Sequence, residues 1–364
     1  MYQLLYVMQR PLLAIVPFLL WAAMLGGCDD HILPADEEKV WGTQRIVFSD
    51  VPTSGSRILT MQLDGGTPDA SMGITGQLLY YPQGGHLLYS VVNSQDNTSF
   101  MLFGPGGARE IISESNYYVY IYLDRPAALT FDAQTVAYVA KHSLWAPWRL
   151  YLHELGVGGD TITIDDDIGE VSSLLFSREG RFLAVNTIRT GDTEERVYIY
   201  DRTTRAFAGP VERLIPGDFL GYTSNWFQWM PDGVLLYAGS DYSGNPGLYS
   251  MPGEGGYPHR IAGGQFSFPT PSSTGTQIAF IRENGLWIMN ADGSGQRRLL
   301  QPDSTLFQSL IAPQWSPDDS KILITRILAD ANNSITALVN DVIDVRTGRY
   351  KSLTTAVYPS FWLK

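Results

Sequence analysis

The stretch that decides the fold is Gln314-Trp315-Ser316-Pro317-Asp318-Asp319-Ser320-Lys321-Ile322-Leu323-Ile324. An aromatic residue, Trp315, ends one expected strand, and the apolar residues 322–324 begin the next. Between them, Pro317 presets φ to about −65°, and the side chain of Asp318 can hydrogen-bond the backbone two residues further on. The pattern therefore predicts a tight β-hairpin.

Variants of this hairpin recur along the chain, roughly 45 residues apart, which is the period of four-stranded propeller blades. Aligned on Trp315, the other anchor positions are Tyr80, Phe131, Phe176, Trp229, Pro271 and Phe361. Each of the six anchors from Tyr80 to Trp315 is followed by three short runs that are rich in β-branched and aromatic residues and bounded by turn signals. We therefore predict an all-β, seven-bladed β-propeller over residues 45–364, with six or eight blades as the alternatives.

The first predicted blade lacks an inner strand of its own before Arg45. The C-terminal residues 356–364 contain the last anchor, and we predict that they supply this strand and close the ring. The rival is that Val40-Trp41 supplies it. We disfavour this rival because the charged residues 36–39 are a poor prelude to a buried central strand.

The N-terminal residues 1–28 have the pattern of a signal peptide, with Arg10 followed by an apolar run that is too short to span a bilayer comfortably. Gly26-Gly27-Cys28 resembles a bacterial lipobox, in which the cysteine is lipidated and becomes the first mature residue. Cys28 is the only cysteine in the chain, so it cannot form an intramolecular disulfide. An uncleaved membrane anchor is the alternative. Asp29 resembles a signal for retention in the inner membrane of bacteria with two membranes.

Residues 29–44 are polar at their start, and we expect them to form a flexible tether between the lipid and the propeller. The chain as a whole carries a formal net charge of −12. An acidic surface argues against a nucleic acid as the main partner and against adhesion to anionic lipid. A soluble, self-repelling surface is the simplest explanation of the charge.

Two stretches strengthen the case for one propeller family: Trp315-Ser316-Pro317-Asp318-Asp319 and Ala291-Asp292-Gly293-Ser294-Gly295-Gln296-Arg297-Arg298-Leu299. Together with residues 239–249, they resemble the repeats of TolB-like propellers, a WD40-like group with a Pro-Asp signature. The resemblance covers roughly residues 45–364 and implies the fold. It leaves function open, because such propellers include periplasmic scaffolds, domains attached to serine peptidases, and oligosaccharide lyases.

Catalytic signatures are sparse. No Gly-x-Ser-x-Gly nucleophile elbow occurs, which argues against a serine peptidase. The histidines fall outside the expected inner strands, which disfavours a metal-dependent lyase. The acidic segment 165–170 offers Asp165, Asp167 and Glu170 as weak calcium ligands, but it lacks the alternating spacing of a standard calcium loop. We expect no cofactor, with Ca²⁺ as the minor alternative.

The most informative asymmetry lies in the loops. The turns between the first and second strands of each unit are tight, whereas the connections between the second and third strands are longer. Exposed loops on a rigid scaffold are where function concentrates. The segment 142–149 holds two tryptophans and an arginine, residue types that are enriched in interface hot spots. The predicted binding face comprises Trp145, Trp148, Arg149, Asp96, Asp192, Asp241, Tyr242 and Asp330.

The sequence thus predicts a bacterial cell-envelope lipoprotein, lipidated at Cys28 and held at the outer face of the cytoplasmic membrane or in the periplasm. Its propeller is expected to act as a non-enzymatic platform for a protein partner. The alternative is a propeller that binds glycans or cleaves them as a metal-dependent lyase. For Trp145 and Trp148, simple coverage of the adjacent blade competes with a binding role.

Overall fold

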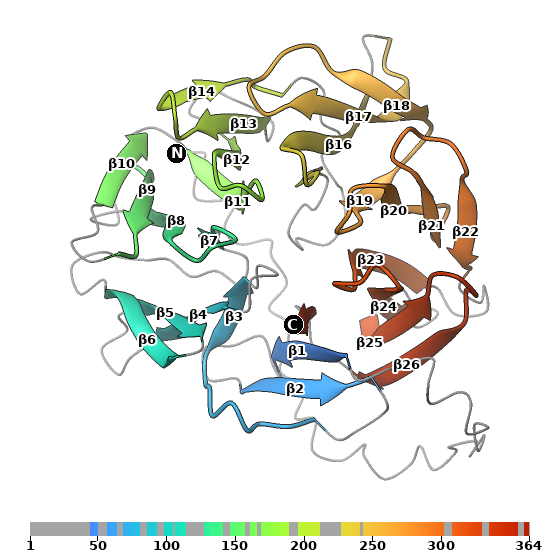
Figure 1. The fold of residues 1–364 in the computed structure, drawn as a ribbon, viewed down its shortest axis with the longest axis horizontal. Coiled ribbons are helices and arrows are strands. Elements are labelled where there is room, and N and C mark those ends of the chain that lie inside the picture. Colours follow the sequence, from blue (N-terminus) through green and yellow to red (C-terminus); the bar gives the residue numbers. More distant parts are fainter. Residues whose placement is uncertain are drawn as a thin grey trace, which may run out of the picture. The chain divides into compact units, whose positions relative to one another are not determined.

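Residues Trp41–Lys364 form one compact unit, and the fold is a ring of seven β-sheets (Figure 1). The computed structural model describes residues 44–49, 57–63, 68–80, 86–92, 98–104, 106–113, 127–140, 146–156, 161–165, 169–188, 196–211, 227–240, 243–301, 308–329, 335–355 and 360–363. All regular structure in these ranges is strand and turn, as predicted for an all-β chain. The segments proposed as signal peptide, including Cys28, and most of the tether lie outside the described residues.

Each sheet is one blade, and its strands A to D run antiparallel from the inside of the ring to the outside. Blade I contains β27 (Ser360–Leu363), β1 (Arg45–Ser49) and β2 (Ile58–Gln62). Blade II contains β3 (Gln77–Tyr80), β4 (Leu87–Val92), β5 (Thr98–Gly104) and β6 (Gly107–Ser113). Blade III contains β7 (Ala127–Leu129), β8 (Thr135–Ala140), β9 (Arg149–Glu154) and β10 (Thr161–Asp165). Blade IV contains β11 (Glu170–Phe176), β12 (Phe182–Ile188), β13 (Arg196–Asp201) and β14 (Ala206–Ala208).

The remaining three blades follow in the same pattern. Blade V contains β15 (Phe227–Trp229), β16 (Val234–Ser240), β17 (Pro246–Pro252) and β18 (His259–Gly263). Blade VI contains β19 (Ser267–Pro271), β20 (Gln277–Arg282), β21 (Gly285–Asn290) and β22 (Arg297–Leu300). Blade VII contains β23 (Gln308–Trp315), β24 (Lys321–Ala329), β25 (Ile335–Asp344) and β26 (Tyr350–Thr355). The prediction of seven blades is therefore confirmed.

Blade I is built from both ends of the propeller, as predicted. The C-terminal strand β27 pairs antiparallel with β1, with Trp362 opposite Ile46 and Phe361 opposite Val47. The blade has three strands, and single bridges, Arg57 to Thr75 and Thr60 to Asp69, occupy the place of its fourth. The rival inner strand at Val40-Trp41 lies outside the described residues.

The hairpins between strands A and B share one turn design in four blades. The hydroxyl oxygens of Thr130, Ser177, Ser272 and Ser316 accept the backbone N–H five residues on, at 2.9–3.1 Å. A residue with positive φ follows three residues after each hydroxyl, at Ala133, Gly180, Gly275 and Asp319. The recurring Ser or Thr therefore provides a hydrogen-bond acceptor for the backbone N–H at the start of strand B.

Two of the predicted anchor positions are wrong. In blade III, Thr130 is equivalent to Ser316, so the residue in the place of Trp315 is Leu129 and not Phe131. In blade I the equivalent of Trp315 is Trp362 and not Phe361, because both indoles donate to a carbonyl oxygen on the inner strand of the preceding blade. Both errors came from aligning on the nearest aromatic side chain.

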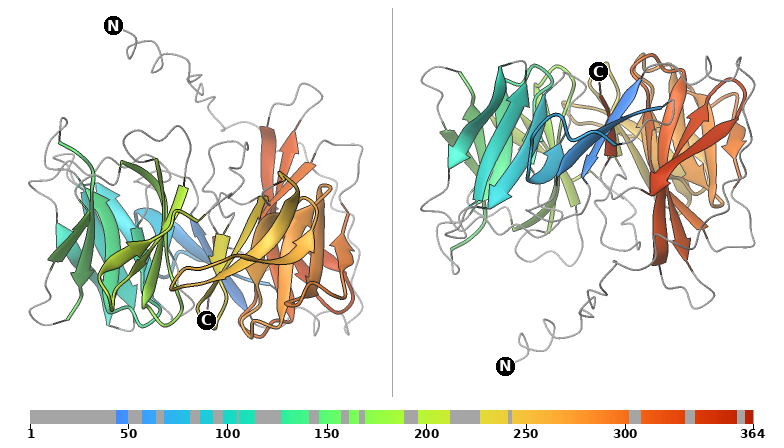
Figure 2. Two further views of the ribbon diagram at one scale, coloured as in Figure 1. Left: turned by 90° about the horizontal axis from the view of Figure 1, so that it is seen from above. Right: turned by 90° about the horizontal axis from the view of Figure 1, so that it is seen from below.

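Apolar side chains fill the spaces between adjacent blades. Strand β8 is buried at every position, because its two faces contact different neighbours. The cluster between blades III and IV includes Leu150 and Leu152 from one blade and Val171 and Leu183 from the other. Figure 2 shows the sheets standing side by side around the ring, which is the arrangement that creates these cores. Every blade therefore depends on its neighbours for burial.

Candidate functional site

The two ends of the ring differ in their connections. Antiparallel strands place the A–B and C–D turns at one end, which we call the turn face, and the B–C connections at the other, which we call the loop face. The B–C connections span residues 50–57, 93–97, 141–148, 189–195, 241–245 and 330–334, whereas blade VI has only the tight turn Glu283-Asn284. Both residues of that turn have positive φ, as in a two-residue type I′ hairpin.

Most residues proposed for binding belong to these connections. Trp145, Asp96, Asp192, Asp241, Tyr242 and Asp330 lie outside the described residues. Trp148 is partly buried and packs against the apolar cluster between blades III and IV. Arg149 begins β9 opposite Ala140. Trp148 therefore covers the blade junction at its loop end, and Arg149 follows it on a regular strand.

Two of the proposed calcium ligands lie at strand ends in neighbouring blades. Asp165 ends β10 opposite Leu150, and Glu170 begins β11 opposite Ile188. Asp167 lies outside the described residues. Among the described ranges, no three His, Cys, Asp or Glu side chains lie close enough together to hold a metal ion.

The middle of blade VII holds a buried polar network that sequence reasoning missed. Asp341 on β25 is fully buried, and its Oδ1 accepts hydrogen bonds from Ser352 Oγ at 2.6 Å and from Arg326 Nη2 at 3.2 Å. Burial raises the pKa of Asp341, and the bonds from Ser352 and Arg326 oppose that rise. The network joins β24, β25 and β26. It therefore cross-links the hairpin of β24 and β25 to the outer strand of the blade.

At the turn face, the A–B turns are bonded to one another across blades. The Asp319 carboxylate of blade VII accepts hydrogen bonds from the backbone N–H groups of Ser273 and Thr274 in blade VI, at 2.6 and 3.1 Å. The Arg178 guanidinium of blade IV donates to the carbonyl oxygen of Ser273 at 3.0 Å. It also lies 5.3 Å from the ring centre of Phe131 in blade III. These bonds tie the turns of several blades together at one end of the ring.

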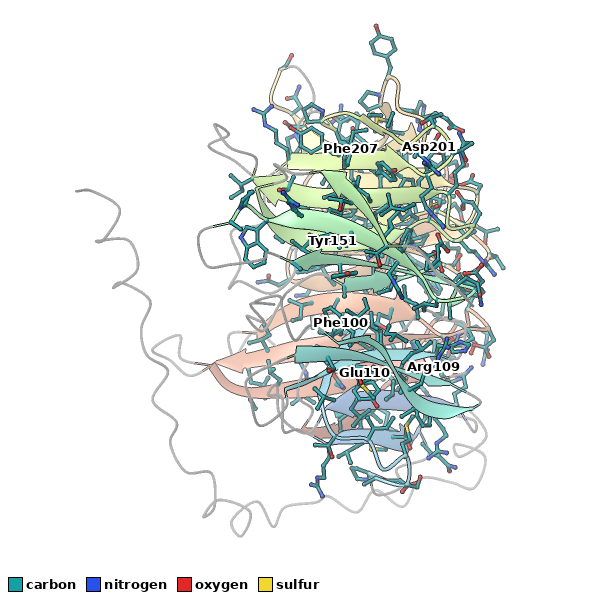
Figure 3. All side chains as sticks on the ribbon, turned by 90° about the vertical axis from the view of Figure 1, so that its left-hand side faces the viewer. Phe100, Arg109, Glu110, Tyr151, Asp201 and Phe207 are labelled. Atoms are coloured by element: carbon teal, nitrogen blue, oxygen red, sulfur yellow. The ribbon has the colours of Figure 1, made fainter. Side chains whose placement is uncertain are left out.

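A cleft of about 290 Å³ opens on the turn face between blades III and IV. One wall is apolar, with Leu152 and Ile162 from β9 and β10. The lining also contains three arginines, Arg181, Arg202 and Arg205. Figure 3 shows Asp201, which lies between these arginines in sequence, on the same side of the ring as Arg109.

Two of the three guanidinium groups are fully engaged. Arg181 makes a bidentate contact with Asp201, at 3.2 and 2.8 Å, and also donates to Glu254 of blade V at 2.8 Å. Hydrogen bonds from Arg181, against the opposing effect of burial, lower the pKa of Asp201. Arg202 donates to Glu154 of blade III at 2.8 Å and to the Gly180 carbonyl at 2.8 Å. These two arginines hold blade IV to its neighbours on both sides.

The third guanidinium differs. Within the described part of the chain, the Arg205 side chain forms no hydrogen bond and no ion pair, although it lines the cleft beside Tyr200. Tyr200 is only 5% exposed, and its hydroxyl has no hydrogen-bond partner among the described residues. Burial raises the pKa of Tyr200, while the nearby charges of Arg205 and Arg202 oppose that rise. The cleft is thus lined by the Arg205 guanidinium and by Tyr200, which lie near each other.

Fold and sites together define a seven-bladed β-propeller with a locked turn face and longer connections at its loop face. No protein-family model matches the chain, and none of the curated proteins does. Solved structures do. A prolyl endopeptidase is 12% identical with a TM-score of 0.53, covering 88% of this chain and 51% of that one. The tricorn protease is 10% identical with a TM-score of 0.51, covering 88% and 36%.

TolB from Acinetobacter baumannii is 15% identical with a TM-score of 0.44, covering 70% of this chain and 63% of that one. The chain therefore spans less than two thirds of the length of each of these three structures. Identities this low show the fold alone, and the seven-bladed β-propeller is the fold that the predicted resemblance implies. No helix of the described residues is long and apolar enough to cross a membrane.

Proposed function

We propose that this chain is a lipid-anchored cell-envelope protein whose propeller serves as a binding platform for another protein, without catalysing a reaction. The observation that supports the platform is the contrast between the two ends of the ring. Asp319 and Arg178 lock the turn face, while six of the seven blades carry longer connections at the loop face. A rigid base with variable connections at one end is the usual design for presenting a binding surface.

The partner would contact the loop face, including Trp148 and the connection 330–334. The buried Arg326–Asp341–Ser352 network supports this, because it stiffens the hairpin that carries 330–334 and lowers the entropy lost on binding. The lipid anchor rests on the sequence, in which Gly26-Gly27 precedes the single Cys28. The acidic charge of the chain fits a protein that is held near a membrane by lipid and not by attraction to anionic headgroups.

The platform is tested by site-specific photo-crosslinking in the native host. A photoreactive amino acid replaces Pro147 or Asn245 at the loop face, and Glu179 or Asp232 at the turn face, as matched exposed positions. We expect one discrete protein adduct from the loop-face variants and none from the turn-face variants. Adducts that arise only from the turn face would contradict the proposed orientation.

The anchor is tested separately by Cys28→Ser. The variant should lose incorporation of labelled palmitate and move from the membrane fraction to the soluble fraction, because the thiol is the acylated group. Continued lipid labelling of the variant would refute the assignment of Cys28. Since crosslinking and fractionation use different variants, one half of the proposal can fail without the other.

A further inference from the structure

We propose that the cleft between blades III and IV is a second binding site, on the turn face, that takes a monocarboxylate carrying a short apolar chain. The cleft lies at the opposite end of the strands from the loop face, so it goes beyond the platform role. Its lining combines Leu152 and Ile162 with the guanidinium of Arg205 and the hydroxyl of Tyr200. The charge, hydrogen-bond donors, backbone conformation and size of the cleft all favour such a ligand.

The available charge in the cleft is that of Arg205. Arg181 and Arg202 are already paired with the carboxylates of Asp201, Glu254 and Glu154 at 2.8 Å. Glu179, at the rim, directs its carboxylate toward Gly233 of blade V. A monoanion matches one free guanidinium, whereas a dianion such as phosphate would also meet repulsion from Glu154 and Glu179.

The lining of the cleft also offers hydrogen-bond donors. Tyr200 is about nineteen-twentieths buried, and its hydroxyl has no partner in the described part of the chain. Tyr200 donates one O–H, and Arg205 presents a planar fork of N–H groups. A carboxylate with two oxygens can accept from both.

The backbone at Arg205 supplies an independent observation. Arg205 has φ of 56°, and its N–H donates to the carbonyl oxygen of Asp201 at 2.7 Å. The equivalent C–D turn of blade VII has Gly348 in this place, with φ of 71° and a bond from its N–H to the Asp344 carbonyl oxygen at 2.8 Å. Glycine adopts this left-handed conformation freely, whereas arginine is strained in it. Strained positions of this kind cluster at functional sites.

The size of the cleft sets the class of ligand. A volume of about 290 Å³ is near the lower end of the range for small-molecule sites. It admits a group of the size of one amino-acid residue, with its aliphatic part against Leu152 and Ile162 and its carboxylate at Arg205. The probe is N-acetyl-leucine. Its amide serves as the uncharged control, and hexyl phosphate serves as the dianionic control.

Binding is measured on the purified full-length protein by titration calorimetry and by chemical-shift changes. We expect N-acetyl-leucine to bind, and the amide and hexyl phosphate to bind at least about tenfold more weakly, because neither provides a matched charge. Equal binding of the amide, tighter binding of hexyl phosphate, or no binding of N-acetyl-leucine would overturn the proposal.

Three variants link binding to these side chains. Arg205→Gly should weaken N-acetyl-leucine binding about tenfold and leave the melting temperature unchanged or raised, because the strain is released. Tyr200→Phe should weaken binding about fivefold, since it removes only the hydroxyl. Gly348→Arg is the matched control in blade VII, and it should lower the melting temperature with no effect on binding. Full affinity in both Arg205→Gly and Tyr200→Phe would refute the assigned roles.

Discussion

Two blade junctions contain the same tryptophan hydrogen bond but differ in how the chain connects the strands. At the VI/VII junction, Trp315 Nε1 donates to the Thr270 carbonyl oxygen at 2.9 Å, and at the VII/I junction, Trp362 Nε1 donates to the Gln314 carbonyl oxygen at 2.9 Å. Blades VI and VII are consecutive along the chain. Strand β27 instead joins blade I only through its pairing with β1. The ring therefore closes without a covalent link between β27 and β1, so opening is expected to begin where these two strands pair in blade I.

The two aspartates of the opening hairpin serve these two junctions separately. Asp319 binds the backbone of Ser273 and Thr274 in blade VI. Asp318 accepts hydrogen bonds within its own turn and from Gln44, which directly precedes β1 of blade I. One Pro-Asp-Asp turn therefore holds the blade on each side, which explains why both acidic residues follow Pro317.

Deleting residues 356–364 should have the largest effect, because it removes the whole inner strand of blade I. Trp362 is 3% exposed, and the loss of a buried tryptophan alone costs about 3–5 kcal/mol. The free energy of unfolding of an ordinary domain is about 5–15 kcal/mol, so the loss of β27 should remove most of it. Urea unfolding followed by circular dichroism measures this. A truncated protein that unfolds at the wild-type midpoint would show that β27 does not close the ring.

The fold could be predicted because its signals are local and repeat. Turn residues, short apolar runs and a period near 45 residues identify blades wherever they occur in the chain. The position of individual anchors was harder, since Leu129 carries no aromatic signal and Phe361 sits beside the true anchor, Trp362. The hydrogen bonds from the Ser/Thr of each turn would have been the better guide.

The cleft could not be predicted, because its parts are distant in sequence. Leu152 comes from blade III, and Tyr200 and Arg205 come from blade IV, with Glu179 contributed by a separate turn. The one available signal was a comparison of C–D turns, in which Arg205 stands where blade VII has Gly348. Sequence reasoning concentrated on the loop face, whose proposed residues are mostly in the B–C connections, and it treated the turn face as plain.

Replacing each junction tryptophan by phenylalanine measures how much its indole hydrogen bond contributes to stability. Trp362→Phe and Trp315→Phe each remove one indole hydrogen bond and leave a carbonyl oxygen without its partner, which should cost about 1–3 kcal/mol at equilibrium. If the ring opens first by release of β27, Trp362→Phe should speed unfolding more than Trp315→Phe, because it weakens the packing of β27 against blade VII before the transition state. Stopped-flow unfolding in urea measures both rates. Equal rates would place the first opening elsewhere.

The smallest expected effect is a loss of stability at low pH through Asp318, which lies at the VII/I junction. Burial raises the pKa of Asp318, but hydrogen bonds from Ser316, Gln44 and Ser320 outweigh it, so the pKa lies below its ordinary value. A lowered folded-state pKa contributes stability that is fully present above the unfolded pKa of about 4 and is lost as the pH falls toward the folded pKa. Because the carboxylate is exposed to solvent, we expect about 1 kcal/mol.

Asp318→Asn should therefore be less stable than the wild type at pH 7 by about 1 kcal/mol, and the difference should shrink below about pH 4. Urea unfolding at pH 7, 5, 4 and 3 measures the difference at each pH. Asp232→Asn is the matched control, because in blade V the Asp232 carboxylate bonds the Val234 N–H of its own turn. If Asp318→Asn and Asp232→Asn lose the same stability at pH 7, Asp318 contributes nothing beyond its own hairpin. In that case the strand pairing of β27 with β1 and the Trp362 bond would hold the junction without it.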